Sequence, residues 1–509
     1  MMSAFKSHLG HFTAEELASA DLSSLVSSTL PAQARHFWGG AWHAGGPNLV
    51  SHNPSTELPL GEFARGGSAE IDAAVQSAHR AFPSWASTPP LERAQRLRLA
   101  ASIVRDHALE LALLDAADCG NPVKAMQMDA EIAAFQLDYF AGLVLENKGE
   151  TLPTGNGSLN YSLREPLGVV GRIFPFNHPF MFAAGKIAAP LAAGNTVVLK
   201  PPEQAPLSTL RLMELLAPVF PPGVLNTVTG GREAGEALAS HPLVAAVGLI
   251  GSIPAGQAVL RASAGNMKRT LLELGGKNAM VVYPDADFQA AVDGAVRGMN
   301  FTWCGQSCGS TSRLLIHESL YDAFIDSLAS LLPSRHIPGV ATHMNTTMGA
   351  LVNQVQFDRS MDYIRTAHAE GAKLVTGGGR PTNLARGFFI EPTVFKDVQP
   401  HHRLAQEEVF GPVLGVMRWR DEEDMLNIVN GLSMGLTASV WTRDLVTAHR
   451  AAMRIQAGYV WINDASIHLP GASFGGYKQS GLGREESFQE LHEFTQIKNI
   501  NVSLRGSRP

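Results

Sequence analysis

The chain has 509 residues, of which 45% are hydrophobic and 17% are charged, and its formal net charge is −6. This length and composition predict a globular protein of roughly two to four domains that needs no disulfide staples. The mildly acidic balance, with no block of Lys or Arg, argues against nucleic acid and anionic membranes as partners.

Cysteine use and the N-terminal sequence indicate the compartment. Cys119, Cys304 and Cys308 are too few for a disulfide framework and lack metal-ligand spacing, so we expect a reducing environment and no metal. No apolar run reaches the roughly 18 residues of a membrane span. Residues 1–35 form an N-terminal extension that contains acidic residues, which a transit peptide would avoid. We therefore expect a cytoplasmic protein.

The predicted elements fall into successive blocks. Residues 35–65 should form hairpins, since aromatics alternate with glycine pairs. Residues 69–147 show helical periodicity, interrupted at Asn121-Pro122. From about residue 167, short β-branched runs alternate with helices, and a second such alternation begins near Leu271; this pattern predicts parallel sheets covered by helices. The C-terminal IKNINVSL resembles an edge strand that pairs with another chain or with the early hairpins.

One cysteine stands in a setting that suits a nucleophile. Cys308 lies within Gly305-Gln306-Ser307-Cys308-Gly309. Small neighbours leave a thiol accessible and let backbone N–H groups face a bound oxygen. The alternative is a buried structural cysteine, as free cysteines often are. Cys304, beside the bulky Trp303, is assigned to that structural class.

Two further motifs carry polar groups suited to catalysis. Glu273 stands in the apolar Leu272-Glu273-Leu274-Gly275-Gly276, where desolvation raises the pKa of a carboxyl group toward the range of a general base. Asn177 in Pro175-Phe176-Asn177 lies between a strand and a helix, and its amide can stabilise an oxyanion. A solvated glutamate at a strand end and a helix N-cap are the respective alternatives.

Other motifs fit a dinucleotide. Lys200 ends a strand and Glu203 follows it, where an acid can accept a hydrogen bond from a ribose hydroxyl. Gly251-Ser252 opens a helix whose free N–H groups suit a pyrophosphate, although no G-x-G-x-x-G stands in a strand–helix setting. The loops around residues 407–413 and 474–481 combine glycine with an aromatic residue, which plain turn chemistry also explains.

Taken in order, these motifs resemble the aldehyde dehydrogenase superfamily over about residues 35–500. They read Pro-Phe-Asn, Lys-Pro-x-Glu-Gln, Gly-Ser-x-x-x-Gly, Glu-Leu-Gly-Gly-Lys, Gly-Gln-x-Cys, Glu-x-Phe-Gly-Pro and Phe-Gly-Gly-x-Lys-x-Ser-Gly. The resemblance is to non-acylating NAD(P)-dependent members that are betaine-aldehyde-dehydrogenase-like or aromatic-aldehyde-dehydrogenase-like.

The resemblance implies an α/β fold with three parts. These are a Rossmann-type NAD-binding domain (36–155 and 166–272), an α/β catalytic domain (273–482) and a small β oligomerisation arm with the tail (156–165 and 483–509). A homodimer or homotetramer is expected from the family and from the unpaired character of the tail strand.

The resemblance also implies residue roles. Cys308 attacks the aldehyde, Asn177 stabilises the oxyanion, and Glu273 activates the water that hydrolyses the thioester. NAD is expected before NADP, because the charge of Glu203 would repel a 2′-phosphate, although family members with this glutamate sometimes accept both cofactors. The residues expected to bind the cofactor are Phe174, Pro175, Phe176, Lys200, Glu203, Gly231, Gly235, Gly251, Ser252, Glu408 and Phe410.

The chain departs from the family pattern near the oxyanion motif, where Phe176 replaces a tryptophan and His178 an apolar residue. We expect His178 either to bind a polar or carboxylate-bearing substrate or to cap the helix. Gly185 stands where a larger residue is common, which predicts a wider tunnel for an aromatic or branched aldehyde. The expected tunnel residues are His178, Met181, Phe182, Gly185, Trp303, His468 and Phe474.

Two rival functions are weighed against this one. A CoA-acylating semialdehyde dehydrogenase passes its thioester to CoA and typically lacks the base that Glu273 would provide. A structural or binding protein with the same fold would be expected to lack Cys308, Glu273 or Asn177, and all three are present.

Overall fold

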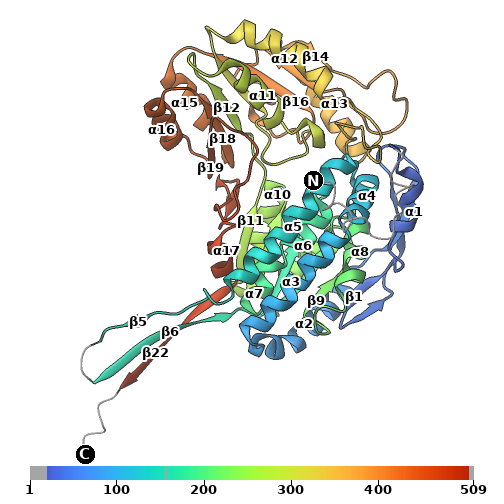
Figure 1. Ribbon diagram of the computed structural model, residues 1–509, viewed down its shortest axis with the longest axis vertical. Coiled ribbons are helices and arrows are strands. Elements are labelled where there is room, and N and C mark those ends of the chain that lie inside the picture. The colour runs from blue at the N-terminus through green and yellow to red at the C-terminus, as the bar shows by residue number, and fades with distance from the viewer. Residues whose placement is uncertain (1–19, 155–156, 504–509) are drawn as a thin grey trace, which may run out of the picture.

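Two helix-covered β-sheets form the body of the protein, and a long β-ribbon projects from it (Figure 1). The computed structural model describes residues 20–154 and 157–503. Parts of the expected N-terminal extension and tail, residues 1–19 and 504–509, lie outside the described residues, as do residues 155–156 of the expected domain and arm. Within the described ranges, every helix is too short or too polar to cross a membrane.

The first sheet has eight strands, and its central strands run parallel, as predicted. In spatial order they are β2 (Ala41–His43), β1 (His36–Trp38), β9 (Leu225–Thr227), β8 (Thr196–Lys200), β7 (Val169–Ile173), β10 (Val244–Ile250), β11 (Arg269–Glu273) and β21 (Gly481–Leu482). Strands β1 and β2 confirm one of the early hairpins, with Phe37 opposite Trp42. Strand β11 pairs with β10 and therefore belongs to the first sheet. The second alternation of strands and helices starts at Ala279 rather than near Leu271.

Helices cover both faces of this sheet. They are α2 (Ser68–Ser87), α3 (Pro90–Asp106), α4 (Ala108–Cys119), α5 (Val123–Leu143), α6 (Pro179–Gly185), α7 (Ala188–Ala193), α8 (Leu207–Leu216), α9 (Arg232–Ser240) and α10 (Ile253–Ser263), after the short α1 (Val26–Thr29). Successive strand residues point to opposite faces. Val169 accordingly packs in a cluster with residues of α2 and α9, and Val170 in another with residues of α3, α5 and α7. The predicted break at Asn121-Pro122 separates α4 from α5.

The second sheet has seven strands and is formed by the region in which the second alternation of strands and helices was predicted. Its spatial order is β14 (Lys373–Thr376), β15 (Thr393–Lys396), β16 (Val413–Trp419), β13 (Arg313–His317), β12 (Ala279–Val282), β18 (Thr437–Trp441) and β19 (Tyr459–Ile462). The helices of this half are α11 (Phe288–Gly298), α12 (Tyr321–Arg335), α13 (Gln354–Ala369), α14 (Arg403–Gln406), α15 (Glu422–Asn430) and α16 (Leu445–Arg454).

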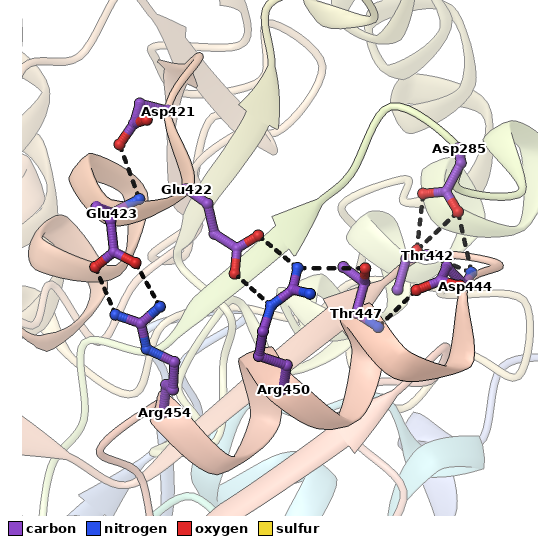
Figure 2. A network of polar contacts seen from close by, with 9 residues as sticks. All are labelled: Asp285, Asp421, Glu422, Glu423, Thr442, Asp444, Thr447, Arg450 and Arg454. Atoms are coloured by element: carbon purple, nitrogen blue, oxygen red, sulfur yellow. Dashed lines mark hydrogen bonds and ion pairs between the residues drawn. The ribbon is translucent and has the colours of Figure 1, made fainter.

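Paired charges hold α15 against α16 at the surface (Figure 2). Arg450 donates two hydrogen bonds to Glu422 at 3.0 and 2.8 Å, and Arg454 binds both oxygens of Glu423. Such two-point contacts fix orientation as well as distance. They lie far along the chain from the candidate catalytic residues and belong to the scaffold of the second sheet.

The C-terminal strand builds the projecting arm (Figure 1). Strand β22 (Thr495–Ser503) pairs along its whole length with β6 (Ser158–Pro166), and β5 (Thr151–Leu152) completes the three-stranded sheet. The early hairpins are therefore not its partner within the chain. Helix α17 (Phe488–Glu493), which precedes β22, contacts α5 and α7 in the body as well as β22. The remaining short strands are β3 (Asn48–His52), β4 (Pro59–Ala64), β17 (Met434–Gly435) and β20 (Tyr477–Lys478).

Candidate active site

Asn177, Glu273 and Cys308 line one cavity of about 410 Å³, although they lie far apart in the sequence. Asn177 follows β7, and Glu273 is the last residue of β11. Both strands flank β10 and run parallel to it, so their carboxyl ends open at the same edge of the first sheet. Cys308 comes from the loop that leads into β13 of the second sheet. The cavity therefore combines the carboxyl edge of one sheet with a loop of the other.

Cys308 is the half-exposed member of the three free cysteines, whereas Cys119 and Cys304 are buried. Burial, with the carboxyl groups of Glu408 and Glu273 nearby, raises the pKa of the Cys308 thiol to about 12. Its loop is held because Asn278 donates a hydrogen bond to the Cys308 carbonyl at 2.7 Å. Cys304 lies in the core of the second sheet, where its thiol donates to the Gly349 carbonyl.

Glu273 is a buried carboxyl group without a partner. Only 4% of the residue is exposed, and both side-chain oxygens lack a hydrogen bond among the described residues. Burial raises its pKa well above the ordinary value, and Glu485 raises it further, while Lys186 opposes the shift. Gly475 leaves room for this carboxyl group, because a Cβ there would come within 2.7 Å of Glu273 Oε1. The Glu273 carboxyl group at the end of β11 is therefore desolvated, as the sequence predicted.

A buried ion cluster beside Glu273 escaped the sequence reasoning. Lys186 Nζ lies 2.9 Å from Glu485 Oε2, and Arg172 Nη2 lies 2.7 Å from Glu485 Oε1. Burial opposes ionisation of Glu485, but Lys186 and Arg172 hold its pKa below the ordinary value. One feature of the sequence indicates this cluster. Lys186 lies within the apolar run MFAAGKIAAP, and a buried lysine requires a partner.

Neither Asn177 nor His178 caps α6 through its side chain. The N-cap position of α6 is His178, and it makes no side-chain cap bond. The Asn177 side chain is buried with Oδ1 unpaired among the described residues, and its carbonyl accepts a hydrogen bond from Asn121 at 2.7 Å. The helix-cap alternatives are thus wrong, and the Asn177 amide remains at the cavity wall.

The residues predicted to bind a ribose lie together after β8. Lys200 is buried, and burial lowers its pKa to about 8 despite the opposing charge of Glu203. Glu203 Oε1 lies 3.0 Å from Arg65 Nε. Gly231 borders this carboxylate, because a Cβ there would come within 2.8 Å of Glu203 Oε2. Gly235 faces open space, because a Cβ added there would meet no atom within 4 Å.

The other predicted cofactor residues divide into two groups. Gly251 and Ser252 stand between β10 and α10, with Ser252 exposed at the helix N-cap. Glu408 accepts a hydrogen bond from the Gly276 N–H at 3.2 Å, and burial raises its pKa to about 7. Phe176 and Phe410 meet edge to face at 5.8 Å, with Pro175 half-buried before them, whereas Phe174 is packed in the core of the first sheet and offers little surface to a ligand.

The predicted tunnel residues line the same cavity, with one exception. The cavity wall includes His178, Met181, Phe182, Trp303, His468 and Phe474. Gly185 is absent from it, because the space beside Gly185 is filled by Gln136, whose Oε1 would lie 2.1 Å from an added Cβ. The prediction that Gly185 widens the tunnel is therefore wrong. One face of α5 supplies wall residues that the sequence reasoning missed: Ile132, Phe135, Gln136, Tyr139 and Phe140.

Two histidines in this wall are held by carboxylates. His178 Nδ1 lies 2.7 Å from Asp129 Oδ2, and its ring packs against Phe182 and Trp303. His468 Nδ1 lies 2.9 Å from Glu486 Oε2. Burial disfavours the charged ring of His468, but Glu486 outweighs it and raises the His468 pKa.

Known proteins share both the sequence and this arrangement. The model of the aldehyde dehydrogenase family matches residues 42–500. The chain belongs to the aldehyde dehydrogenase family. Aldehyde dehydrogenase tropH of Talaromyces stipitatus is 47% identical over 494 residues, 95% of this chain and 96% of that protein. Hydroxyisobutyraldehyde dehydrogenase of Mycolicibacterium austroafricanum is 41% identical over 466 residues, 91% of this chain and 92% of that protein.

Comparison with solved structures also identifies aldehyde dehydrogenases. An NAD⁺ complex of aldehyde dehydrogenase from Bacillus cereus is similar with a TM-score of 0.92 and 37% identity, over 95% of this chain and 99% of that chain. The protein is therefore an NAD(P)-dependent aldehyde dehydrogenase with an α/β fold.

The residues of this aldehyde dehydrogenase fit a dinucleotide. The Glu203 carboxylate lies against Gly231, where a Cβ would crowd it, and Lys200 lies at the end of the neighbouring strand. The N-terminus of α10 is exposed at Ser252, and the positive end of a helix suits a pyrophosphate, although Ser252 Oγ already accepts from the Ala255 N–H. A buried lysine, an acid beside a glycine and an open helix N-terminus at one sheet edge suit ribose and phosphate binding.

Alkylation should discriminate among the cysteines of this dehydrogenase. We expect iodoacetamide to modify Cys308 first, because Cys119 and Cys304 are buried. Its rate should rise with pH through the alkaline range, since the thiol pKa is raised to about 12. Peptide mass spectrometry measures each site, and Cys308→Ser serves as the control. Faster modification of Cys304 would contradict this accessibility.

Proposed function

We propose that Cys308, Glu273 and Asn177 carry out the oxidation of the aldehyde, with Cys308 as nucleophile. The observation that supports this assignment is that a half-exposed thiol, an unpaired buried carboxyl group and a primary amide line one cavity. These are the groups that a covalent route through a thioester requires.

In the first step, the Cys308 thiol releases its proton to solvent, and the resulting thiolate forms a bond to the aldehyde carbon. The carbonyl π electrons move to oxygen, which becomes an oxyanion. The Asn177 amide and the Cys308 backbone N–H donate hydrogen bonds to that oxygen. A positioned donor of this kind typically contributes about 3 kcal/mol to transition-state stabilisation.

Oxidation converts this adduct into a thioester on Cys308. NAD(P), which Lys200, Glu203 and the N-terminus of α10 would hold, would supply this two-electron oxidation as a hydride acceptor. A water molecule must then attack the thioester carbon, with loss of a proton and cleavage of the C–S bond. The Glu273 carboxylate takes up that proton, and the acid product leaves a free Cys308.

The rival in which CoA accepts the acyl group is disfavoured by the same residue. Glu273 is positioned at the cavity with no competing hydrogen bond among the described residues. A carboxylate in this place can activate the water molecule that hydrolyses the thioester. A requirement for CoA in turnover would instead support the acylating reaction.

Substitutions should separate the two chemical steps. Cys308→Ala should abolish NADH formation while NAD binding survives, measured by NADH absorbance and by titration of the bound nucleotide. Glu273→Gln should slow turnover by about 10²- to 10⁴-fold and leave an acyl-enzyme detectable by intact-protein mass spectrometry. Near-normal activity of Cys308→Ala, together with loss of activity in Cys304→Ala, would overturn the nucleophile assignment.

The pH dependence follows from the raised pKa of Glu273. The base form is the carboxylate, so lowering the pH through this raised pKa removes it and slows hydrolysis. Thioester hydrolysis in the wild type should therefore accelerate as the pH rises, and Glu273→Gln should lose that part of the profile.

We further propose that the enzyme prefers NAD over NADP. Glu203 stands beside Gly231, and its charge would repel a 2′-phosphate in that place. Glu203→Gln should raise the ratio of kcat/KM for NADP to that for NAD by at least about tenfold, because like-charge repulsion is removed and Arg65 becomes free to pair with phosphate. Steady-state kinetics with both cofactors measure this ratio, and no change in it would count against Glu203 as the determinant.

We propose that the arm joins copies of this chain into a homodimer or homotetramer. In the β6–β22 pairing, Leu159 lies opposite Val502 and Tyr161 opposite Ile500, so these side chains and Leu163 share one face. Leu159 and Leu163 are each 42% exposed, so this face of the projecting strand presents apolar side chains together. A second chain would cover this face.

Charge on that face should dissociate the oligomer. Leu159→Asp with Leu163→Asp should reduce the mass measured by light scattering during size-exclusion chromatography. The matched control is Ser162→Asp, which lies between these positions on the opposite face of the strand. A monomeric wild type, or an equal effect of the control, would oppose the proposal. We also propose a cytoplasmic location, which the three free cysteines favour.

A further inference from the structure

The cavity wall contains a buried amide that the reaction does not use. Gln136 on α5 is 8% exposed and lines the cavity together with Cys308. Among the described residues, nothing forms a hydrogen bond with its side-chain amide. Of the other two amides at the wall, Asn300 donates to Ser310 Oγ at 3.4 Å and Asn177 has the oxyanion role proposed above. The amide atoms are not fully enclosed by protein, so they face the cavity, where a ligand or water can complete their hydrogen bonds.

Gly185 keeps this amide in place. A Cβ at position 185 would come within 2.1 Å of Gln136 Oε1 and within 3.1 Å of its Cδ, so any larger residue would displace the amide. The glycine and the glutamine therefore form one structural unit. The space that Gly185 opens is used for a polar group in the tunnel.

The surrounding wall suits a flat ring. Aromatic side chains from three parts of the chain border the cavity, including Phe182, Trp303, Trp461 and Phe474. Such side chains favour stacked or edge-to-face contact with another aromatic ring. A volume of about 410 Å³ accommodates a substituted benzene ring.

The charges of the wall favour a neutral substrate. Asp129, Glu131 and Glu486 all border the cavity. The two cations of the wall, Lys186 and His468, are already paired with carboxylates. These acids are themselves paired, Asp129 with His178, Glu131 with Arg105 and Glu486 with His468. The described wall therefore offers a substrate carboxylate no cation without a partner, whereas a hydroxyl group carries no charge and can both donate to and accept from an amide.

We propose that Gln136 recognises a hydroxyl group on the ring of an aromatic aldehyde, so that the substrate class is the hydroxylated aromatic aldehydes. This inference rests on the proposed function, since Cys308 must react with the aldehyde carbon in the same cavity. His178 contributes a second polar edge, because Asp129 engages its Nδ1 and leaves Nε2 for a ligand. Of the two substrate types expected at His178, the carboxylate-bearing one is disfavoured by the charges of the wall.

The test compares ring substituents in the purified enzyme with NAD. The panel contains benzaldehyde, the 2-, 3- and 4-hydroxybenzaldehydes, 4-formylbenzoate and acetaldehyde, and the readout is kcat/KM from NADH release. In the wild type, kcat/KM for the best hydroxybenzaldehyde should exceed that for benzaldehyde by about tenfold, the typical value of a satisfied hydrogen bond to a buried group. The value for 4-formylbenzoate should fall below that for benzaldehyde.

Two substitutions should disturb the Gln136 amide, one at Gln136 itself and one at the neighbouring Gly185. Gln136→Leu removes the amide, and Gly185→Ala displaces it; both should lower the ratio of the hydroxybenzaldehyde to the benzaldehyde kcat/KM toward one. The matched control is Gln127→Leu, the same change on the same helix at a half-buried position outside the cavity wall, and it should keep the wild-type ratio. NADH binding, followed by fluorescence, confirms that each variant is folded.

The outcomes are distinguishable. Turnover of benzaldehyde and acetaldehyde with no preference for a hydroxyl group, or an unchanged ratio in a folded Gln136→Leu, overturns the role of Gln136 and leaves the proposed function intact. A preference for 4-formylbenzoate overturns the hydroxyl assignment in favour of an anionic substrate. Absence of NADH with every aldehyde, in a protein that binds NAD, overturns the proposed function itself and this inference with it.

Discussion

The burial of Glu273 is the constraint on which the rest of the site depends. Its carboxyl group stands at the end of β11 without a hydrogen-bond partner among the described residues, where burial raises its pKa. Such a group is costly to maintain in a core, and a carboxyl group with a perturbed pKa in a cavity is a candidate for function. The parallel strands of the first sheet hold it there, and the loop of Cys308 from the second sheet closes the cavity.

Glycines determine where the polar groups of the site can lie. Gly475 makes room for the Glu273 carboxyl group, Gly231 for the Glu203 carboxylate and Gly185 for the Gln136 amide. In each case a Cβ would come within 3 Å of a side-chain oxygen, closer than real Cβ atoms come. Small residues thus make room for the proposed base, the proposed cofactor-binding acid and the amide in the cavity wall. A substitution at any of these glycines acts through the polar group that it would displace.

The ion cluster and the histidine pairs make the cavity polar without making it positive. Glu485 is shared by Lys186 and Arg172, and carboxylates hold His178 and His468. Because each cation already has a partner, little positive charge is left for an anionic substrate. Recognition then depends on shape and on neutral hydrogen bonds, which is the setting in which a buried amide discriminates most sharply.

Much of the architecture was predictable because local periodicity records which side of an element is buried. The valine-rich runs specify β7, β8 and β10, and the break at Asn121-Pro122 separates two helices. Periodicity does not record the neighbour, so the pairing of β22 with β6 and the membership of β11 in the first sheet required the tertiary structure.

The sequence by itself determined the chemical types at the site: a thiol among small residues, an acid among leucines, an amide between a strand and a helix. Only the tertiary structure decided that these three line one cavity, that Lys186 pairs with Glu485, and that Gln136 occupies the space beside Gly185. The physical reason is the separation along the chain of the residues that interact. A motif reports residues a few positions apart, whereas each of these contacts joins side chains of separate elements, whose distance is set by how sheets and helices pack.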